Sequence, residues 1–256
     1  MTWTPFLQAG AMAFFLGLGL MFPREQQGLF IRETVVNVLT GGLLFLVRVG
    51  LLVATAQVSF ETSGLLDGAV LSHPALQFLV AFLILDVARY GVHYADHRVE
   101  FLWAFHRVHH SSERLNATSG LRMHVVDLFQ LTAIPLVVYG LILDTSSFPL
   151  WVVPSALALG ILFDCFQHAN IAMDMSKTRN RLFNSLLNNP HFHSWHHTQD
   201  GHLRDGNYGN VLVIWDRIFK TDVTQNELPE AFGLPKDQQL EQGVLGLQKL
   251  RLQADS

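Results

Sequence analysis

The sequence predicts an all-α membrane protein, with four to five transmembrane helices beneath a cytoplasmic, histidine-rich helical cap. Half of the 256 residues are hydrophobic, and only 15% are Asp, Glu, Lys or Arg, against roughly 25% in an ordinary soluble protein. Twelve of the thirteen histidines lie after residue 92. The alternative is a soluble protein with buried helices, but several long uncharged runs are hard to bury in a chain of this length.

Five apolar runs are candidate spans. They cover residues 6–22, 34–60, 68–85 (with an extension towards residue 93), 128–143 and 145–163. Crossing about 30 Å of hydrocarbon takes ~20 residues, so the fourth run is short for a span. The first run could instead be a signal peptide, but it lacks a basic start and a small-residue cleavage site. We therefore expect a retained helix there.

The placement of positive charge predicts the orientation of these spans. Segments 1–5, 59–73 and 144–148 contain no Lys or Arg, whereas the segments at the opposite ends contain several, beginning with Arg24 and Arg32. Lys and Arg accumulate on the cytoplasmic side of membrane proteins. The N-terminus is thus expected outside and the histidines at the cytoplasmic face of a bacterial inner membrane or of the endoplasmic reticulum.

Charge and cysteine content exclude several classes. Lys and Arg number 17 against 21 Asp and Glu, a net charge of −4, which disfavours nucleic acid as a partner. Cys165 is the only cysteine. One cysteine rules out an intrachain disulfide framework, a cysteine-ligated zinc ribbon and a cysteine-ligated iron–sulfur cluster.

Eight histidines form three short boxes, one HxxxH and two HxxHH. They are His93 and His97, then His106, His109 and His110, and then His193, His196 and His197. On a helix, residues four apart lie on one face, about 6 Å apart along the axis. We therefore expect each box to direct two or three imidazole nitrogens towards one point.

These boxes indicate a metal centre with two ions. Imidazole suits zinc, copper, iron and nickel. A single zinc ion takes three or four ligands, and the HExxH motif of zinc proteases is absent. Eight box histidines exceed what one ion can use, and His168, at the inner end of the fifth run, is a ninth candidate ligand. The sequence thus predicts a dinuclear site at the cytoplasmic face.

The remaining four histidines carry weaker expectations. His73 lies on the opposite side of the membrane and is expected to be incidental. His191 and His202 flank the last box, as loop residues or as neighbours of the ligands. His124 is left open, as a ligand or a close neighbour.

Three segments carry a resemblance to a known family. They are HYADHRVEFLWAFHRVHHSSERLNATSGLRMH, FQHANI and PHFHSWHHTQDGHLRDGNYGNVLVIWDRIFKT. In their order and spacing they resemble the fatty acid hydroxylase superfamily, and within it the sterol desaturase type. The similarity spans roughly residues 75–225. It suggests N-terminal spans over 1–73, a catalytic domain over 74–225 and a cytoplasmic tail over 226–256.

The resemblance implies an integral-membrane, non-haem di-iron oxidase. The nine histidines would hold two iron ions, and no catalytic residue beyond these ligands is implied. O₂ would be the co-substrate for hydroxylation or desaturation of a lipid C–H bond, in a sterol, a fatty-acyl chain or a related molecule. Relatives that carry a further histidine four residues after the one at position 168 would have it where this chain has Ala172.

Electrons are expected from a partner, because no flavin-binding glycine fingerprint or haem-domain sequence is visible. A ferredoxin or cytochrome b5-like donor with its reductase would fill that role. Two other classes stay open: a metal transporter, which would need polar ligands along its spans, and a metal-binding or structural membrane protein without oxidase activity.

Three charged residues near or within the apolar runs have competing interpretations. Asp86 could anchor the metal site or pair with Arg89 within one helix. The Asp164 carboxylate, four residues before His168, is expected to hydrogen-bond that ring, as carboxylates beside metal-binding histidines often do. Arg48 is expected to pair with a buried carboxylate or to contact a substrate head group. At the C-terminus, residues 238–252 are expected to form an amphipathic helix.

Overall fold

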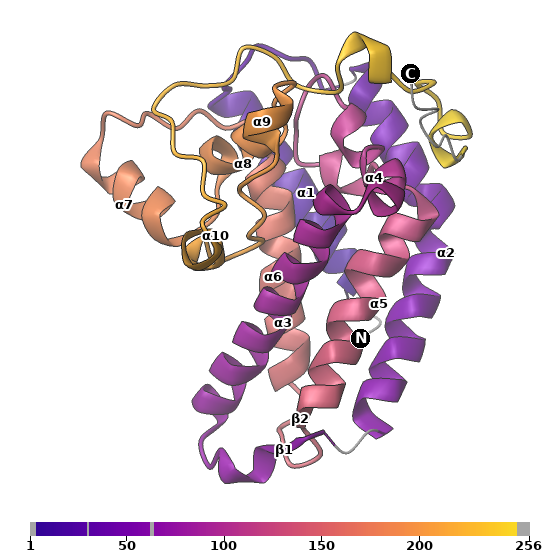
Figure 1. Ribbon diagram of the computed structural model, residues 1–256, viewed down its shortest axis with the longest axis vertical. Coiled ribbons are helices and arrows are strands. Elements are labelled where there is room, and N and C mark those ends of the chain that lie inside the picture. The colour runs from indigo at the N-terminus through magenta and orange to yellow at the C-terminus, as the bar shows by residue number, and fades with distance from the viewer. Residues whose placement is uncertain (1–3, 30, 62–63, 250–256) are drawn as a thin grey trace.

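A computed structural model describes residues 4–29, 31–61 and 64–249. Five long helices form a trunk, and short helices and loops form a cap on one end of it (Figure 1). The trunk helices are α1 (Thr4–Met21), α2 (Arg32–Glu61), α3 (Pro74–Arg98), α5 (Val125–Ile142) and α6 (Val152–His168). The predicted all-α membrane fold is confirmed.

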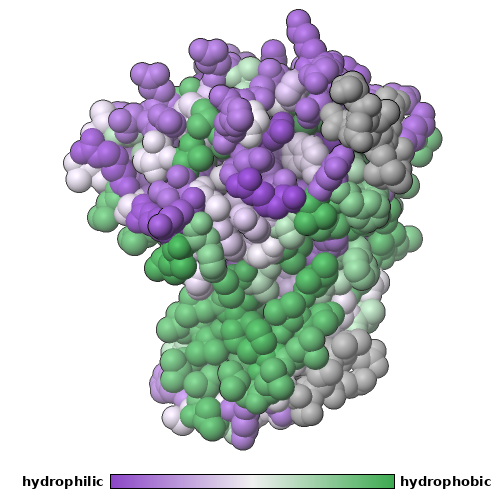
Figure 2. Space-filling model, viewed as in Figure 1, coloured by the Kyte–Doolittle hydropathy of each residue, from purple (hydrophilic) through white to green (hydrophobic). Residues whose placement is uncertain are grey.

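Three trunk helices, α2, α3 and α5, are long and apolar enough to cross a membrane, whereas α1 and α6 are shorter apolar helices. Figure 2 shows the consequence on the surface, where the trunk is covered by apolar side chains and the cap by polar ones. Phe14 and Leu46, for example, are 61% and 79% exposed. A continuous apolar surface of this kind, on helices long enough to span a membrane, is typical of a face that contacts lipid.

The ends of the trunk helices explain where the predicted spans needed adjustment. The third begins at Pro74 rather than residue 68, because Pro74 occupies the first turn and the His73 ring accepts a hydrogen bond from the Ala75 amide. The preceding residues form β1 (Leu66–Asp67) and a 3₁₀ turn (Gly68–Val70). β1 pairs in parallel with β2 (Leu143–Asp144) at the end of the trunk away from the cap.

Packing in the trunk joins the first two helices to the rest of the chain. α1 packs against α6, α2 against α5, and α3 against both α5 and α6. The main core cluster includes Phe82 of α3, Leu136 and Tyr139 of α5, and Val152 and Ala156 of α6. The trunk therefore holds α3 and α6 rigidly side by side, with their cap-proximal ends next to each other.

The cap is built from short elements. They are α4 (Glu100–His106), 3₁₀ turns at His109–Ser111 and Ser119–Leu121, α7 (Thr178–Leu186), α8 (Pro190–His196), α9 (Gly201–Arg204), α10 (Ile214–Phe219), and 3₁₀ turns at Lys236–Gln238 and Gly246–Gln248. The N-terminus of α8 is well capped. The Asn189 side chain accepts hydrogen bonds from two amides of the first turn, and Pro190 is the first helical residue.

The amphipathic helix expected over residues 238–252 is wrong for the part that the structure describes, which ends at residue 249. Only the two 3₁₀ turns form there. Gln248 instead binds across the chain, because its side-chain amide donates to the Met123 carbonyl and accepts from the Val125 amide. Gly246 also lies so close to Glu241 that a Cβ would be 2.6 Å from the Glu241 carbonyl oxygen.

Candidate metal centre

The structure brings all nine candidate histidines together at the junction of trunk and cap. They come from the ends of α3 and α6, from α4 and the turn after it, and from α8. Eight are buried and His93 is half-buried. They form two groups, and within each group the ring nitrogens lie within 4.8 Å of one another. The five-histidine group is His93, His97, His106, His110 and His196, and the four-histidine group is His109, His168, His193 and His197.

Each HxxHH box directs two of its rings, those four residues apart, to one group, as expected, and the third ring to the other group. His106 and His110 belong to the five-histidine group, while His109 belongs to the four-histidine group. In the last box, the sharing is reversed. His193 and His197, four residues apart, lie together, and His196 faces the other group. Neighbouring positions on a helix differ by ~100° in direction, so adjacent histidines serve different sites.

The spacing of the ring nitrogens fits metal ions. In the four-histidine group, the His168 Nε2 lies 3.1 Å from the His109 Nε2 and 3.0 Å from the His193 Nε2. In the other group, the His110 Nε2 lies 3.1 Å from that of His97 and 3.2 Å from that of His106. Nitrogens bound ~2.1 Å from one ion would be roughly 3.0–3.4 Å apart.

Backbone carbonyls fix the tautomer of three of these rings. The Nδ1 atoms of His93, His196 and His168 donate to the carbonyls of Tyr208, Gly206 and Asp164 at 2.8, 2.8 and 2.7 Å. A carbonyl oxygen can only accept, so the proton sits on Nδ1 and the lone pair of Nε2 faces the group. The Nε2 atoms of His93 and His196 are buried without a hydrogen-bond partner. A cation in each group would satisfy these lone pairs.

Two carboxylates support the five-histidine group. The His106 Nδ1 lies 3.0 Å from an Asp127 oxygen, and the His97 Nδ1 lies 3.3 Å from an Asp205 oxygen. Asp127 is fully buried and adjoins a second fully buried carboxylate, Asp96, which lies 4.0 Å from His106. Among the described residues, no carboxylate oxygen contacts a ring nitrogen of the four-histidine group.

Sequence reasoning missed these carboxylates, although one signal was available. A charged residue at the start of an apolar span is costly unless it is paired. Asp127 is such a residue, but nothing in the sequence names its partner, which lies 21 positions away.

Burial favours the neutral form of five cap histidines, and the neutral form is the one that binds metal. It lowers the pKa of the His109, His110, His193, His196 and His197 rings well below the ordinary value, and the surrounding imidazoles lower it further. Uncharged rings leave a lone pair free for a metal ion. For His106, burial alone would lower the pKa, but the Asp127 carboxylate raises it above its ordinary value.

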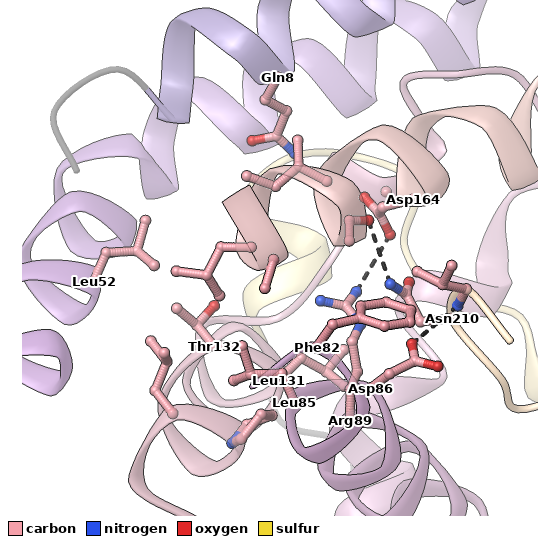
Figure 3. Close-up of a pocket in the computed structure, with 18 of the residues that line it drawn as sticks. Gln8, Leu52, Phe82, Leu85, Asp86, Arg89, Leu131, Thr132, Asp164 and Asn210 are labelled. Carbon is pink, nitrogen blue, oxygen red and sulfur yellow. Dashed lines mark hydrogen bonds and ion pairs between the residues drawn. The ribbon is translucent and has the colours of Figure 1, made fainter. Parts of the chain in front are cut away.

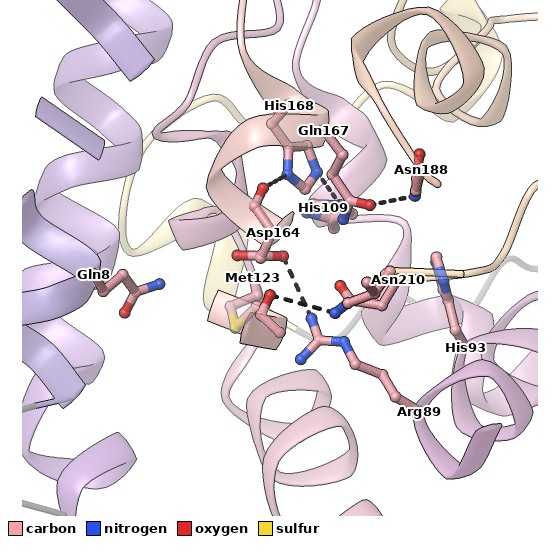
Figure 4. A network of polar contacts seen from close by, with 12 residues as sticks. Gln8, Arg89, His93, His109, Met123, Asp164, Gln167, His168, Asn188 and Asn210 are labelled. Carbon is pink, nitrogen blue, oxygen red and sulfur yellow. Dashed lines mark hydrogen bonds and ion pairs between the residues drawn. The ribbon is translucent and has the colours of Figure 1, made fainter. Parts of the chain in front are cut away.

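The expected hydrogen bond between the Asp164 carboxylate and His168 is wrong in one respect. The ring binds the backbone carbonyl of Asp164, while the carboxylate pairs with Arg89 at 3.3 Å (Figure 4). Neither interpretation of Asp86 holds fully. Its carboxylate accepts hydrogen bonds from the amides of Val211 and Leu212 and from the Trp215 indole, and so anchors the loop before α10 to α3.

Arg48 pairs with no carboxylate in the described residues. Its guanidinium donates to the Gln8 side chain at 2.7 Å and contacts the Met123 sulfur at 3.3 Å.

The other histidines lie outside both groups. His124 caps α5 and binds the Gln248 carbonyl, and His191 binds the Gln225 carbonyl. His202 is exposed, and His73 caps α3 at the far end of the trunk. Ala172 is exposed beyond the end of α6.

A large cavity opens within the trunk (Figure 3). It lies between α1, α2, α3, α5 and α6 and is partly open to the outside. Most of its wall is apolar, with Leu52, Phe82 and Leu136 among the lining residues. A smaller cavity continues it towards the candidate metal centre and is lined by histidines of both groups.

Comparisons with known proteins agree with this geometry. The family model described as fatty acid hydroxylase matches residues 78–221. An alkylglycerol monooxygenase of Homo sapiens is 33% identical over 147 residues, which cover 57% of this chain and 31% of that protein. An ornithine lipid hydroxylase of Rhizobium tropici is 31% identical over 150 residues, covering 57% of this chain and 42% of the relative. The chain thus matches less than half the length of either relative, and no solved structure matches it.

Proposed function

The chain belongs to the fatty acid hydroxylase family, and from this premise we propose that it is an O₂-dependent, di-iron membrane hydroxylase acting on a lipid C–H bond. The relatives are named as a monooxygenase and a hydroxylase, which favours hydroxylation over desaturation. The sterol type suggested by the sequence has no support among these names. The observation that carries the proposal is the pair of buried histidine groups at the end of a mostly apolar cavity in the trunk.

In this proposal, one iron ion is held by the five-histidine group and the other by the four-histidine group. Iron in such a site supplies the activation of O₂, a chemistry that protein side chains lack. In the overall reaction, one oxygen atom of O₂ enters the C–H bond and the other leaves as water, with two electrons and two protons supplied from outside.

The chain itself contributes binding, orientation and exclusion of water. The carbonyls of Tyr208, Gly206 and Asp164 hold protons on Nδ1 of three ligands, so that each Nε2 stays available. The Asp127 carboxylate holds His106 in the same way, and such partners strengthen the metal bond. The apolar cavity would hold the lipid chain with its reacting carbon towards the histidines.

Electrons would come from a ferredoxin or from a cytochrome b5-like protein with its reductase. In the proposed orientation, the cap and both histidine groups face the cytoplasm, where such donors are found. A reporter fused after Ser256 should then be active only in the cytoplasm, and activity only on the other side would overturn the orientation.

The test of the proposed function is lipid profiling of a strain that lacks the protein against one that expresses it. A lipid that gains one oxygen atom only in the expressing strain, and not in one expressing His196→Ala, supports the hydroxylase. Identical lipid profiles with metal-loaded protein in the membrane would favour the metal-binding or structural alternative.

A further inference from the structure

An ion pair stands where the large cavity meets the smaller one. Arg89 of α3 and Asp164 of α6 line both cavities, together with Gly120 and Asn210. Arg89 lies four residues before His93, and Asp164 four residues before His168. Four residues of helix advance about 6 Å. This polar neck, defined by Arg89, Asp164 and Asn210, therefore lies one helical turn from a candidate ligand of each group.

The ion pair is open to the cavity rather than sealed within protein. One guanidinium nitrogen of Arg89 lies 3.3 Å from one Asp164 oxygen, longer than the roughly 2.7–2.9 Å of a strong charge-assisted hydrogen bond. The side chains are 30% and 15% exposed, and what they are exposed to is the cavity they line. Figures 3 and 4 show both side chains pointing into the space between α3 and α6.

The backbone opposite is shaped to admit this pair. A Cβ built on Gly120 would lie 2.4 Å from an Asp164 carboxylate oxygen, so any other residue would displace that carboxylate. Asn210 is held in turn, because its side-chain amide donates to the Gly160 carbonyl of α6. The Asn210 side-chain oxygen is buried with no hydrogen-bond partner. The neck thus offers donors from Arg89 and acceptors from Asp164, beside the amide of Asn210.

We infer that this polar neck binds a neutral, oxygen-bearing group of the lipid, such as a hydroxyl or an ester, and so places the oxidised carbon within a few bonds of that group. The inference rests on the proposed function and adds the substrate class and the position of attack. Because Arg89 and Asp164 pair with each other, an anion or a cation would be attracted by one member of the pair and repelled by the other. A hydroxyl can accept from Arg89 and donate to Asp164, and an ester can accept from Arg89. The rest of the lipid chain would extend into the apolar cavity, away from the histidines.

The experiment measures binding and product together, on the iron-loaded protein in detergent with a chemical reductant. The probes are a long-chain monoacylglycerol, the free fatty acid of equal length and the matching linear alkane. Equilibrium binding of radiolabelled probe gives affinity, and mass spectrometry of the product gives the position of the new oxygen. We expect the monoacylglycerol to bind at least about tenfold more tightly than the alkane or the fatty acid, since one hydrogen bond to a charged group contributes that much.

Variants of the polar neck test whether its residues position the lipid or only support the fold. Arg89→Gln and Asp164→Asn should each remove the preference for the monoacylglycerol and spread the oxidised position along the chain, with iron content unchanged. Arg89→Lys should restore part of the preference. The matched control is Lys177→Gln, which removes an exposed ion pair with Asp174 of the same 3.3 Å length, outside the cavity. This variant should change neither the affinity for the monoacylglycerol nor the position of the new oxygen.

The outcomes distinguish this inference from the function it rests on. Oxidation in the middle of the chain, or equal affinity for monoacylglycerol and alkane in the parent protein, overturns the role of the neck and leaves the hydroxylase standing. No oxidation of any lipid by iron-loaded, reduced protein counts against the hydroxylase, while the binding preference still reports on the neck.

Discussion

The two histidine groups are built from the same boxes but are supported differently. The five-histidine group is backed by two carboxylates, Asp127 and Asp205, and by two carbonyls of the 206–212 loop. Among the described residues, the four-histidine group is supported by backbone contacts alone, from Asp164 to His168 and from Arg122 to His109. Negative charge near a cation strengthens its binding. Two sites that both consist of histidines can therefore differ in how tightly they hold a metal ion, because different carboxylates and carbonyls hydrogen-bond their rings.

The largest effect is expected when one candidate ligand is removed from either histidine group. His196→Ala opens the five-histidine group and His109→Ala opens the other. Each variant should lose about half of its iron, and turnover should fall below detection in both, because the proposed reaction needs both ions. Iron per chain by elemental analysis and product by mass spectrometry are the readouts. His202→Ala, at an exposed position outside both groups, is the control. Normal turnover in either variant would exclude that residue as an essential ligand.

Replacing a carboxylate behind the ligands should have a smaller effect, confined to one group. Asp127→Asn should speed the loss of iron from the five-histidine group by about 10–100-fold. Asp205→Asn should do less, because the Asp205 side chain is 35% exposed and lies farther from its ring. Iron release to a chelator, followed over time, measures both rates. Equal rates of iron release from Asp127→Asn and the parent protein would show that the Asp127 carboxylate does not determine how tightly iron is held.

The 206–212 loop offers a third test, because it supports only the five-histidine group. The Asp86 carboxylate accepts two hydrogen bonds from this loop, from the Val211 and Leu212 amides, and one from Trp215 of α10. Asp86→Asn should therefore lower the free energy of unfolding by roughly 1.5–3 kcal/mol, with faster amide exchange in residues 206–212. Chemical denaturation and hydrogen exchange report these changes. Unchanged exchange in the loop would mean that α3 does not hold it.

Asp216 should make the free energy of unfolding depend on pH. Its carboxylate accepts hydrogen bonds from the Tyr208 and Gly209 amides, and burial raises its pKa from 3.8 to about 6. The folded protein then binds this proton more tightly than the unfolded chain does. The contribution of Asp216 to the free energy of unfolding should fall as pH rises from about 4 to about 6. The difference in stability between the parent and Asp216→Asn, measured across that range, should shrink; a constant difference would contradict the shift.

The sequence predicted the helices of the trunk well. It predicted only in part which histidines lie together and which residues hydrogen-bond them. Long uncharged runs define spans locally, and the i,i+4 spacing placed His93 and His97 on one face of α3. The division of each HxxHH box between two groups depends on where α4 ends, at His106, and on which side of α8 faces α6. The partners of Asp127, Asp86 and Asp164 come from other elements, so tertiary packing decides them and local spacing cannot.

The most direct measurement of the central claim is an anaerobic titration of the metal-free protein with ferrous ion. Two groups of unequal support predict close to two equivalents bound in two phases, the tighter lost in His196→Ala and the weaker lost in His109→Ala. Saturation at one equivalent, or loss of the same phase in both variants, would contradict two separate histidine sites.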